Sequence, residues 1–126
     1  STVGYRLYSQ HGIRGIRGEV AQGLPAVKNI GLPIFRNCLE KGMEANLAGV
    51  MALLHLIAQV EDTNMISRGG LEGAREGAFQ TSLLLNKIPT VEQIEALDDW
   101  FIQKNLSPGG CADLLAAVYF VHGLTK

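Results

Sequence analysis

Hydrophobic residues recur every three or four positions between Leu39 and Ile57, which is the spacing of one face of an α-helix. We therefore expect one long helix from about Asn37 to Val60. A polar stretch follows this helix directly and contains two carboxylates, an amide, a guanidinium group and a glycine pair. The pattern predicts a polar turn at the C-terminal end of a buried helix, and turns of this kind often carry functional residues.

The segment after the polar turn also has helical character, from Leu71 to Leu85, and Asn86 to Pro89 ends it. Thr90-Val91-Glu92-Gln93 then has the form of a capping box, in which the first and fourth residues bond to each other's backbone N–H groups. This motif predicts a helix from Val91 to about Asn105.

The triplet Gly-Leu-Pro occurs twice near the start of the chain, at 23–25 and at 31–33. Because both glycine and proline disfavour a helix interior, we expect residues 20–35 to form short helical turns linked by kinks. With the helices above, the sequence predicts an all-α fold. The expected architecture is a compact bundle of about five to seven helices with short glycine- and proline-containing loops, forming a single domain over residues 1–126.

Composition excludes several classes of function. The 126 residues are 47% hydrophobic and carry a formal charge of −1, so they can bury a core and offer no basic surface for nucleic acid. The longest apolar run is shorter than the roughly 20 residues of a membrane span. The cysteines, Cys38 and Cys111, lack the spacing of metal ligands, and we expect reduced thiols in a cytoplasmic protein.

The first candidate site is the polar stretch Glu61-Asp62-Thr63-Asn64, with Arg68-Gly69-Gly70 behind it. Carboxylates at the edge of a core have perturbed pKa values unless a cation or a metal compensates them, and such groups are frequent at functional sites. The alternative is that Glu61 and Asp62 only end a helix and pair with Arg68 on the surface.

The second candidate is Ser107-Pro108-Gly109-Gly110, followed by Asp113. Ser107 suits an N-cap and Pro108 the first helical position, so a last helix is expected from here to about His122. Gly109 and Gly110 would leave the first-turn N–H groups open to an anion such as phosphate. We expect Asp113 in the same first turn, with a low pKa or as a ligand of Mg²⁺; a simple capped helix is the alternative.

A glycine-rich segment near the N-terminus, residues 12–19, contains Arg14, Arg17 and Glu19. Its backbone N–H groups and the two arginines are suited to phosphate oxygens, and Glu19 is a weaker candidate for an acidic cluster. A surface loop without function is the alternative. If the two glycine pairs at 69–70 and 109–110 lie together, they would form one anion-binding pocket flanked by Asp62 and Asp113.

These motifs, in this order, resemble the triphosphoribosyl-dephospho-CoA synthase family, which makes the prosthetic-group precursor of citrate lyase and of malonate decarboxylase. The resemblance covers the whole chain and corresponds to the family's C-terminal part. Cys111 stands where the family pattern has a small Ser, and Ser67 where a His is common. The resemblance implies an all-helical pentosyltransferase that moves the 5-triphosphoribosyl group of ATP to the 2′-hydroxyl of 3′-dephospho-CoA and releases adenine.

The resemblance also suggests a role for each candidate residue. Asp62, or Glu61 in its place, would be the base or a metal ligand, and Asn64 would orient a substrate hydroxyl. Arginine side chains and accessible backbone N–H groups would bind the triphosphate. The residues concerned are Arg14, Arg17, Arg68, Gly69, Gly70, Ser107, Gly109 and Gly110. Asp113 would hold Mg²⁺.

Two other classes of function remain open at this point. One is a non-catalytic helical module that binds nucleotide or assembles with a missing N-terminal segment. The other is a nucleotide N-glycosidase or hydrolase that uses water as acceptor. Self-association is expected in either case if the chain leaves apolar helix faces uncovered.

Overall fold

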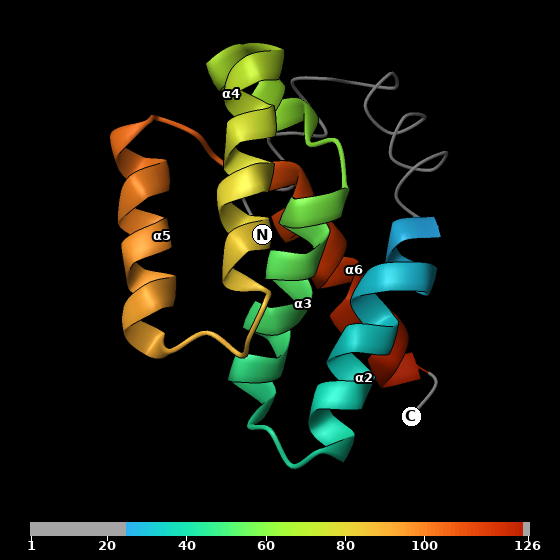
Figure 1. Ribbon diagram of the computed structural model, residues 1–126. Helices are drawn as coiled ribbons and strands as arrows, with labels where there is room; N and C mark the ends of the chain where they lie inside the picture. Colours follow the sequence, from blue (N-terminus) through green and yellow to red (C-terminus); the bar gives the residue numbers. More distant parts are fainter. Residues whose placement is uncertain (1–24, 125–126) are drawn as a thin grey trace.

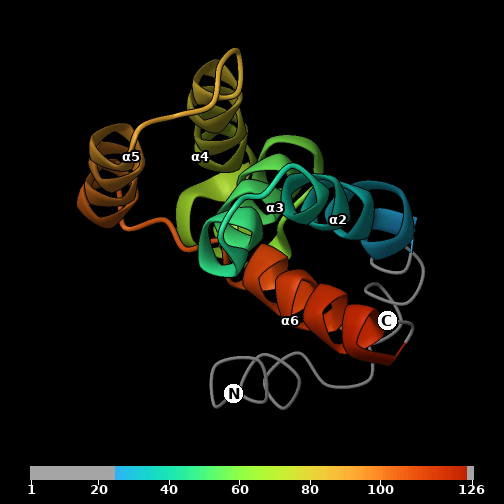
Figure 2. The same ribbon diagram turned by 90° about the horizontal axis from the view of Figure 1, so that it is seen from below.

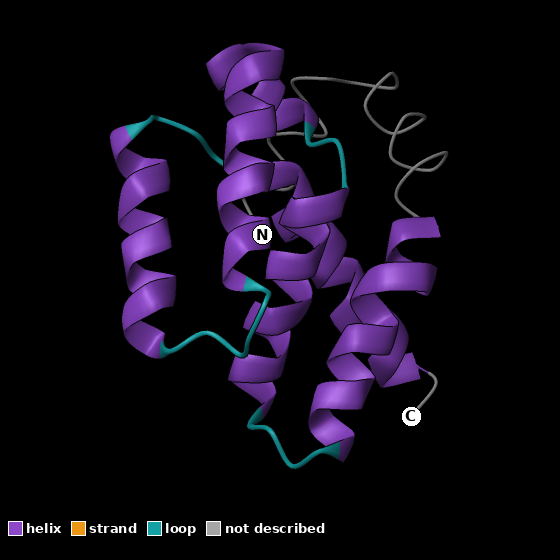
Figure 3. Cartoon of the chain, in the orientation of Figure 1, coloured by secondary structure: helices purple, strands orange, loops and turns teal. Residues whose placement is uncertain are grey.

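The computed structural model describes residues 25–124. These residues form a π-helical segment, η1 (Val27–Gly31), and five α-helices. The α-helices are α2 (Leu32–Glu40), α3 (Ala45–Gln59), α4 (Thr63–Leu84), α5 (Val91–Gln103) and α6 (Gly109–Leu124). The described part of the chain contains no strand (Figure 3). This confirms the predicted all-α fold and the expected number of helices.

Helix α3 is the centre of the arrangement. It packs against η1, α2, α4 and α6, while α5 packs on α4 and stands apart from the other helices (Figures 1 and 2). Along α3 the fully buried side chains include Ala48, Ala52 and Leu56, which face Met65 and Val118 in the common core. A helix that is apolar nearly all round is stable only when neighbours cover it on several sides, which explains its central position.

The predicted helix from Asn37 to Val60 is wrong in one respect, because the chain reverses direction at Lys41–Glu44 and so forms two helices. Gly42 has φ +87° at the end of α2, where the Met43 N–H donates to the Cys38 carbonyl and the Gly42 N–H to the Leu39 carbonyl, both at 3.0 Å. This is a Schellman motif, which favours glycine because its left-handed residue has no Cβ to clash. The apolar spacing continues through the turn because α2 and α3 both face the core.

The predicted kinks in residues 20–35 can be compared only from Pro25 onward, and there they are wrong. The backbone stays helical through Gly31 and Leu32, where η1 passes into α2. Gly31 is needed for a close helix crossing, since a Cβ there would lie 2.6 Å from Val118 Cγ2 of α6. The glycine thus serves packing between helices and does not break the chain.

The predicted capping box of α5 is confirmed. Thr90 Oγ1 accepts from the Gln93 N–H at 3.1 Å, and Gln93 Oε1 accepts from the Thr90 N–H at 2.9 Å. Helix α5 ends in a second Schellman turn, with Asn105 at φ 53° and the Leu106 N–H donating to the Phe101 carbonyl at 2.9 Å. This turn sends the chain back toward the start of α4.

Candidate functional site

Asp62 is the N-cap of α4. Its Oδ1 accepts from the backbone N–H groups of Asn64, at 2.9 Å, and Met65, at 3.2 Å. Aspartate is a favoured N-cap because its side chain supplies acceptors to the first-turn N–H groups, which have no partner within the helix. Helix α4 therefore begins inside the polar stretch that was predicted to be a turn.

The same carboxylate also holds the start of α6. Asp62 Oδ2 accepts from the Cys111 N–H at 3.0 Å, although the two residues are 49 positions apart. A Cβ on Gly110 would lie 3.0 to 3.3 Å from the Asp62 carboxylate atoms, so glycine at 110 permits this close approach. Asp62 is only 4% exposed. One side chain thus caps two helices.

Two further contacts join the segment before α6 to α4. Asn64 Nδ2 donates to the Ser107 carbonyl at 2.9 Å, and Arg68 Nη1 donates to Asn105 Oδ1 at 3.3 Å. Gly69 packs directly against Leu106. The two glycine-pair segments, whose proximity the sequence left open, therefore lie together, in the upper part of the view in Figure 1, where α4 and α6 begin. We call this region, comprising residues 61–70 and 105–113, the Asp62 corner.

Gly70 interrupts α4 with φ +73° and ψ 176°, so the helix resumes after the glycine pair. Ser67, Arg68, Gly69 and Gly70 are all exposed around this interruption. A positive φ is accessible to glycine without a Cβ clash. The prediction that a glycine pair precedes a helical run from Leu71 is therefore confirmed, while the residues in front of it are helical too.

Asp113 differs from its predicted state in two ways. Counted from Gly109, where α6 begins, it is the fifth residue and lies beyond the first turn; the Ala112 N–H already donates to the Pro108 carbonyl at 2.9 Å. Its pKa is raised, first by burial and then by the negative charge of Asp62, whereas a low pKa was predicted. Its Oδ2 is covered and has no hydrogen-bond partner.

The late start of α6 also corrects the predicted cap. Pro108 stands just before the helix and Ser107 lies one residue further out, where its carbonyl accepts from Asn64. Asp62 provides the cap that Ser107 was expected to provide. Sequence spacing could not reveal this role, because the cap comes from a distant part of the chain.

The other predicted site residues have different positions. Glu61 is exposed beside the buried Asp62. Arg14, Arg17 and Glu19 lie outside the described residues. Cys111 is free and fully buried, and burial together with Asp62 strongly raises the pKa of its thiol.

Residues 25–124 contain no group of three or more His, Cys, Asp or Glu side chains arranged to hold a metal ion. Asp62 and Asp113 are two carboxylates at one corner, and the unpartnered Oδ2 of Asp113 is chemically suited to a hard cation. Magnesium is commonly bound by one or two carboxylates together with substrate phosphates. The donor set therefore fits a magnesium ion that a polyphosphate brings with it.

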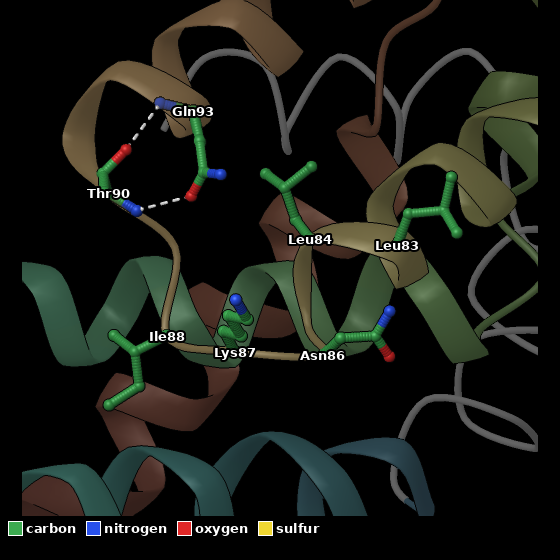
Figure 4. A pocket seen from close by; sticks show the side chains of 7 residues that line it. All are labelled: Leu83, Leu84, Asn86, Lys87, Ile88, Thr90 and Gln93. Atoms are coloured by element: carbon green, nitrogen blue, oxygen red, sulfur yellow. Dashed lines mark hydrogen bonds between the residues drawn. The ribbon is translucent and has the colours of Figure 1, made fainter.

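A cavity of about 530 Å³ lies at the other end of α4, where the chain turns into α5 (Figure 4). Its lining contains a single charged side chain, Lys87, and the polar pair Thr90 and Gln93, which is engaged in the capping box. No carboxylate lines it, so it lacks a group for acid–base chemistry or cation binding. We place the candidate site at the Asp62 corner for this reason.

Comparison with known proteins assigns the family. The family model for ATP:dephospho-CoA triphosphoribosyl transferase, CitG, matches residues 1–126. The chain belongs to this family. It is 43% identical over 130 residues to a probable 2-(5''-triphosphoribosyl)-3'-dephosphocoenzyme-A synthase of Vibrio cholerae serotype O1 (strain M66-2), and 37% identical over 126 residues to a synthase of that name from Escherichia fergusonii.

The CitG relatives are longer than this chain. The alignment with the Vibrio cholerae relative covers 99% of this chain and 42% of the relative, and that with the Escherichia fergusonii protein covers 94% and 41%. The chain thus spans about two fifths of the length of the curated relatives it matches. No solved structure matches it. None of the helices in residues 25–124 is both long and apolar enough to cross a membrane.

Proposed function

We propose that the protein transfers the 5-triphosphoribosyl group of ATP to the 2′-hydroxyl of 3′-dephospho-CoA. The bond between ribose C1′ and adenine N9 breaks, a bond from C1′ to the acceptor oxygen forms, and the proton of the acceptor hydroxyl is passed to the departing adenine, which is released in its neutral form. Membership of the CitG family supports the reaction. The location of the site is supported by the hydrogen bond from the Cys111 N–H to the Asp62 carboxylate. This bond links the segment of one glycine pair to that of the other and brings Asp62 and Asp113 to the same corner.

The carboxylates of the Asp62 corner suit the chemistry of this step. Loss of adenine from C1′ generates an oxocarbenium-like state, which a nearby negative charge stabilises, and the acceptor hydroxyl needs a base. Asp62 and Asp113 are the two candidates for these roles, with Glu61 as the alternate base. Asn64 would orient a substrate hydroxyl from the first turn of α4.

The triphosphate would lie on the cationic and glycine-rich side of the corner. Arg68, Gly69 and Gly70 are exposed there, and an interrupted helix presents backbone N–H groups suited to anions. Gly109 and Gly110 are not proposed as phosphate contacts, because Gly109 is buried and the Asp62 carboxylate lies against Gly110 and accepts from the Cys111 N–H. Arg14 and Arg17 are proposed as further phosphate contacts, and Glu19 as a further acidic group.

Magnesium is the proposed companion of the triphosphate, held by Asp113 or by Asp62 at the same corner. When bound, it would neutralise phosphate charge as a Lewis acid. The chain's own residues would orient the nucleotide against the acceptor and keep the ribose close to the carboxylates.

The physiological role proposed is synthesis of the prosthetic-group precursor of citrate lyase or of malonate decarboxylase in the cytoplasm. The free state of Cys38 and Cys111 agrees with a reducing compartment. We also propose that the protein associates, with a second copy or with further family sequence. The basis is the outer face of α6, where four apolar residues are exposed at successive turns: Ala112, Ala116, Phe120 and Leu124.

Incubation with ATP, Mg²⁺ and dephospho-CoA tests the proposed activity, with free adenine measured by chromatography. The proposal expects adenine only when dephospho-CoA is present, in a one-to-one ratio with the new triphosphoribosyl product. Adenine released without acceptor would instead indicate a hydrolase. No adenine under either condition would leave a binding or assembly module and contradict the proposed transfer.

A further inference from the structure

We propose that the two aspartates of the corner have different roles: Asp62 is a positioning residue that fixes the start of α6, and Asp113 is the carboxylate that meets the substrate. The inference rests on the proposed triphosphoribosyl transfer and deepens it. It follows from the way in which Asp62 is bonded and from the absence of any bond to Asp113 Oδ2.

Both oxygens of Asp62 are already committed to the protein. Oδ1 accepts two N–H groups of α4 and Oδ2 accepts the N–H of Cys111. The side chain is also 4% exposed, so a substrate would have little access to it. A group that acts on a substrate must reach within hydrogen-bond distance of the reacting atom. Asp62 would have to leave both helix caps to do so.

Asp113 has the opposite character. Its side chain is partly exposed, and its Oδ2 is covered without a hydrogen-bond partner. Buried polar atoms in folded proteins nearly always have a partner, so an unpartnered one calls for an explanation such as an absent ligand or ion. A ribose hydroxyl or a phosphate-bound cation would supply the missing partner.

The two residues are mechanically connected through α6. Asp113 follows Cys111 by two positions on the same helix, and the bond from the Cys111 N–H to Asp62 fixes where that helix begins. A shift of this bond therefore moves Asp113 relative to α4 and to Arg68. Asp62 acts on the substrate only through this placement.

Gly110 offers a matched variant that disturbs the connection while the protein keeps every carboxyl group. In Gly110→Ala the new Cβ lies 3.0 Å from Asp62 Oδ1 and 3.3 Å from Oδ2, which forces the capping carboxylate to shift. In Asp62→Asn the amide oxygen can still cap α4, but the NH₂ group that replaces Oδ2 faces the Cys111 N–H and cannot accept from it. Both variants weaken the contact between Asp62 and the start of α6, one by steric crowding and the other by loss of a hydrogen-bond acceptor.

The experiment compares kcat and the KM for ATP in the wild type, Asp62→Asn, Gly110→Ala and Asp113→Asn, well below their melting temperatures. Asp113→Asn is expected to lower kcat by about 10²-fold to 10⁴-fold. Asp62→Asn and Gly110→Ala are each expected to lower kcat by about tenfold, which is less than the effect of Asp113→Asn. In both variants the KM for ATP is expected to stay within about twofold of the wild-type value. A wild-type kcat in both would reduce Asp62 to a purely structural cap and overturn the proposal. The proposal would also be overturned if Asp62→Asn lowered kcat as much as Asp113→Asn does while Gly110→Ala kept the wild-type kcat.

A second readout does not depend on turnover. The side-chain carboxyl ¹³C signals of Asp62 and Asp113 are followed by NMR as ATP and Mg²⁺ are added. The Asp113 signal is expected to move and the Asp62 signal to stay, and the reverse would overturn the assignment. If the wild type transfers no triphosphoribosyl group, the proposed function fails. If it transfers the group but the Asp62 signal alone responds, only this inference fails.

Discussion

Cys111 occupies the joint between α4 and α6, with its N–H bonded to Asp62 and its thiol fully buried. Burial, together with the charge of Asp62, keeps the pKa of this thiol far above its ordinary value. Only the thiolate is an effective nucleophile, so we expect iodoacetamide at pH 8 to leave Cys111 unmodified in the native protein while it labels the partly exposed Cys38. Peptide mass spectrometry measures both.

Unfolding the protein in denaturant before labelling provides the control, because both cysteines should then react. If Cys111 in the native protein were labelled as fast as Cys38, the contact between the start of α6 and Asp62 would have to open readily. Such labelling would also contradict the rigid placement of α6 on which the account depends.

At the residue scale, the sequence indicated which residue types meet at the Asp62 corner, but not how they contact one another. The residue types of Glu61-Asp62-Thr63-Asn64 and the glycines at 109 and 110 were enough to mark two candidate segments, but the sequence left open whether these segments lie together. The double cap by Asp62 and the raised pKa of Asp113 were not predictable, because both depend on a contact across 49 positions. The prediction of a low pKa for Asp113 considered only the dipole of its own helix. It did not include the carboxylate of Asp62, which comes from another helix.

At the scale of elements, the contact between α4 and α5 depends on Gly77. A Cβ there would lie 2.6 Å from Met65 Cε and 2.9 Å from Phe101 Cε1 of α5. We expect Gly77→Ala to lower the free energy of unfolding by about 1–3 kcal/mol, because overpacking forces these side chains off their positions. Urea denaturation measures the change.

Gly73→Ala is the matched control on the same helix. Its Cβ would lie 3.6 Å from Leu106 Cδ2, an ordinary contact. Alanine is preferred over glycine in a helix interior by about 1 kcal/mol, so this variant should be neutral or stabilising. Equal effects of the two substitutions would contradict the packing described for α5.

Sequence signals predicted helices well where the signal was local. The capping box at Thr90 and Gln93 marked the start of α5 correctly because all its atoms lie within four residues. The turn at Gly42 was missed because the core-facing apolar spacing runs through it, and glycine alone does not distinguish a Schellman turn from a close crossing such as Gly31. The difference depends on what packs against each glycine.

At the scale of the whole molecule, α6 is apolar on its outer face as well as on the face that meets α3. Phe120 is 68% exposed and Leu124 69% exposed. We expect the protein to self-associate as its concentration rises, and Phe120→Glu to shift it toward the monomer, because a charge on an apolar contact must be desolvated. Sedimentation velocity measures the distribution.

The control for this prediction is Ile102→Glu, which introduces the same charge at an exposed apolar position of α5, 67% exposed. It should leave the sedimentation distribution unchanged. A wild-type protein that stays monomeric throughout, or equal effects of both variants, would contradict association through α6.

The position of the nucleotide site is tested most directly by a ¹H–¹⁵N NMR titration of the protein with ATP and Mg²⁺. The account predicts that amide signals move in two segments, residues 64–70 and 107–113, while those lining the cavity at the far end of α4, from Leu83 to Gln93, stay in place. Shifts centred on Leu83 to Gln93, with the Asp62 corner unaffected, would contradict it.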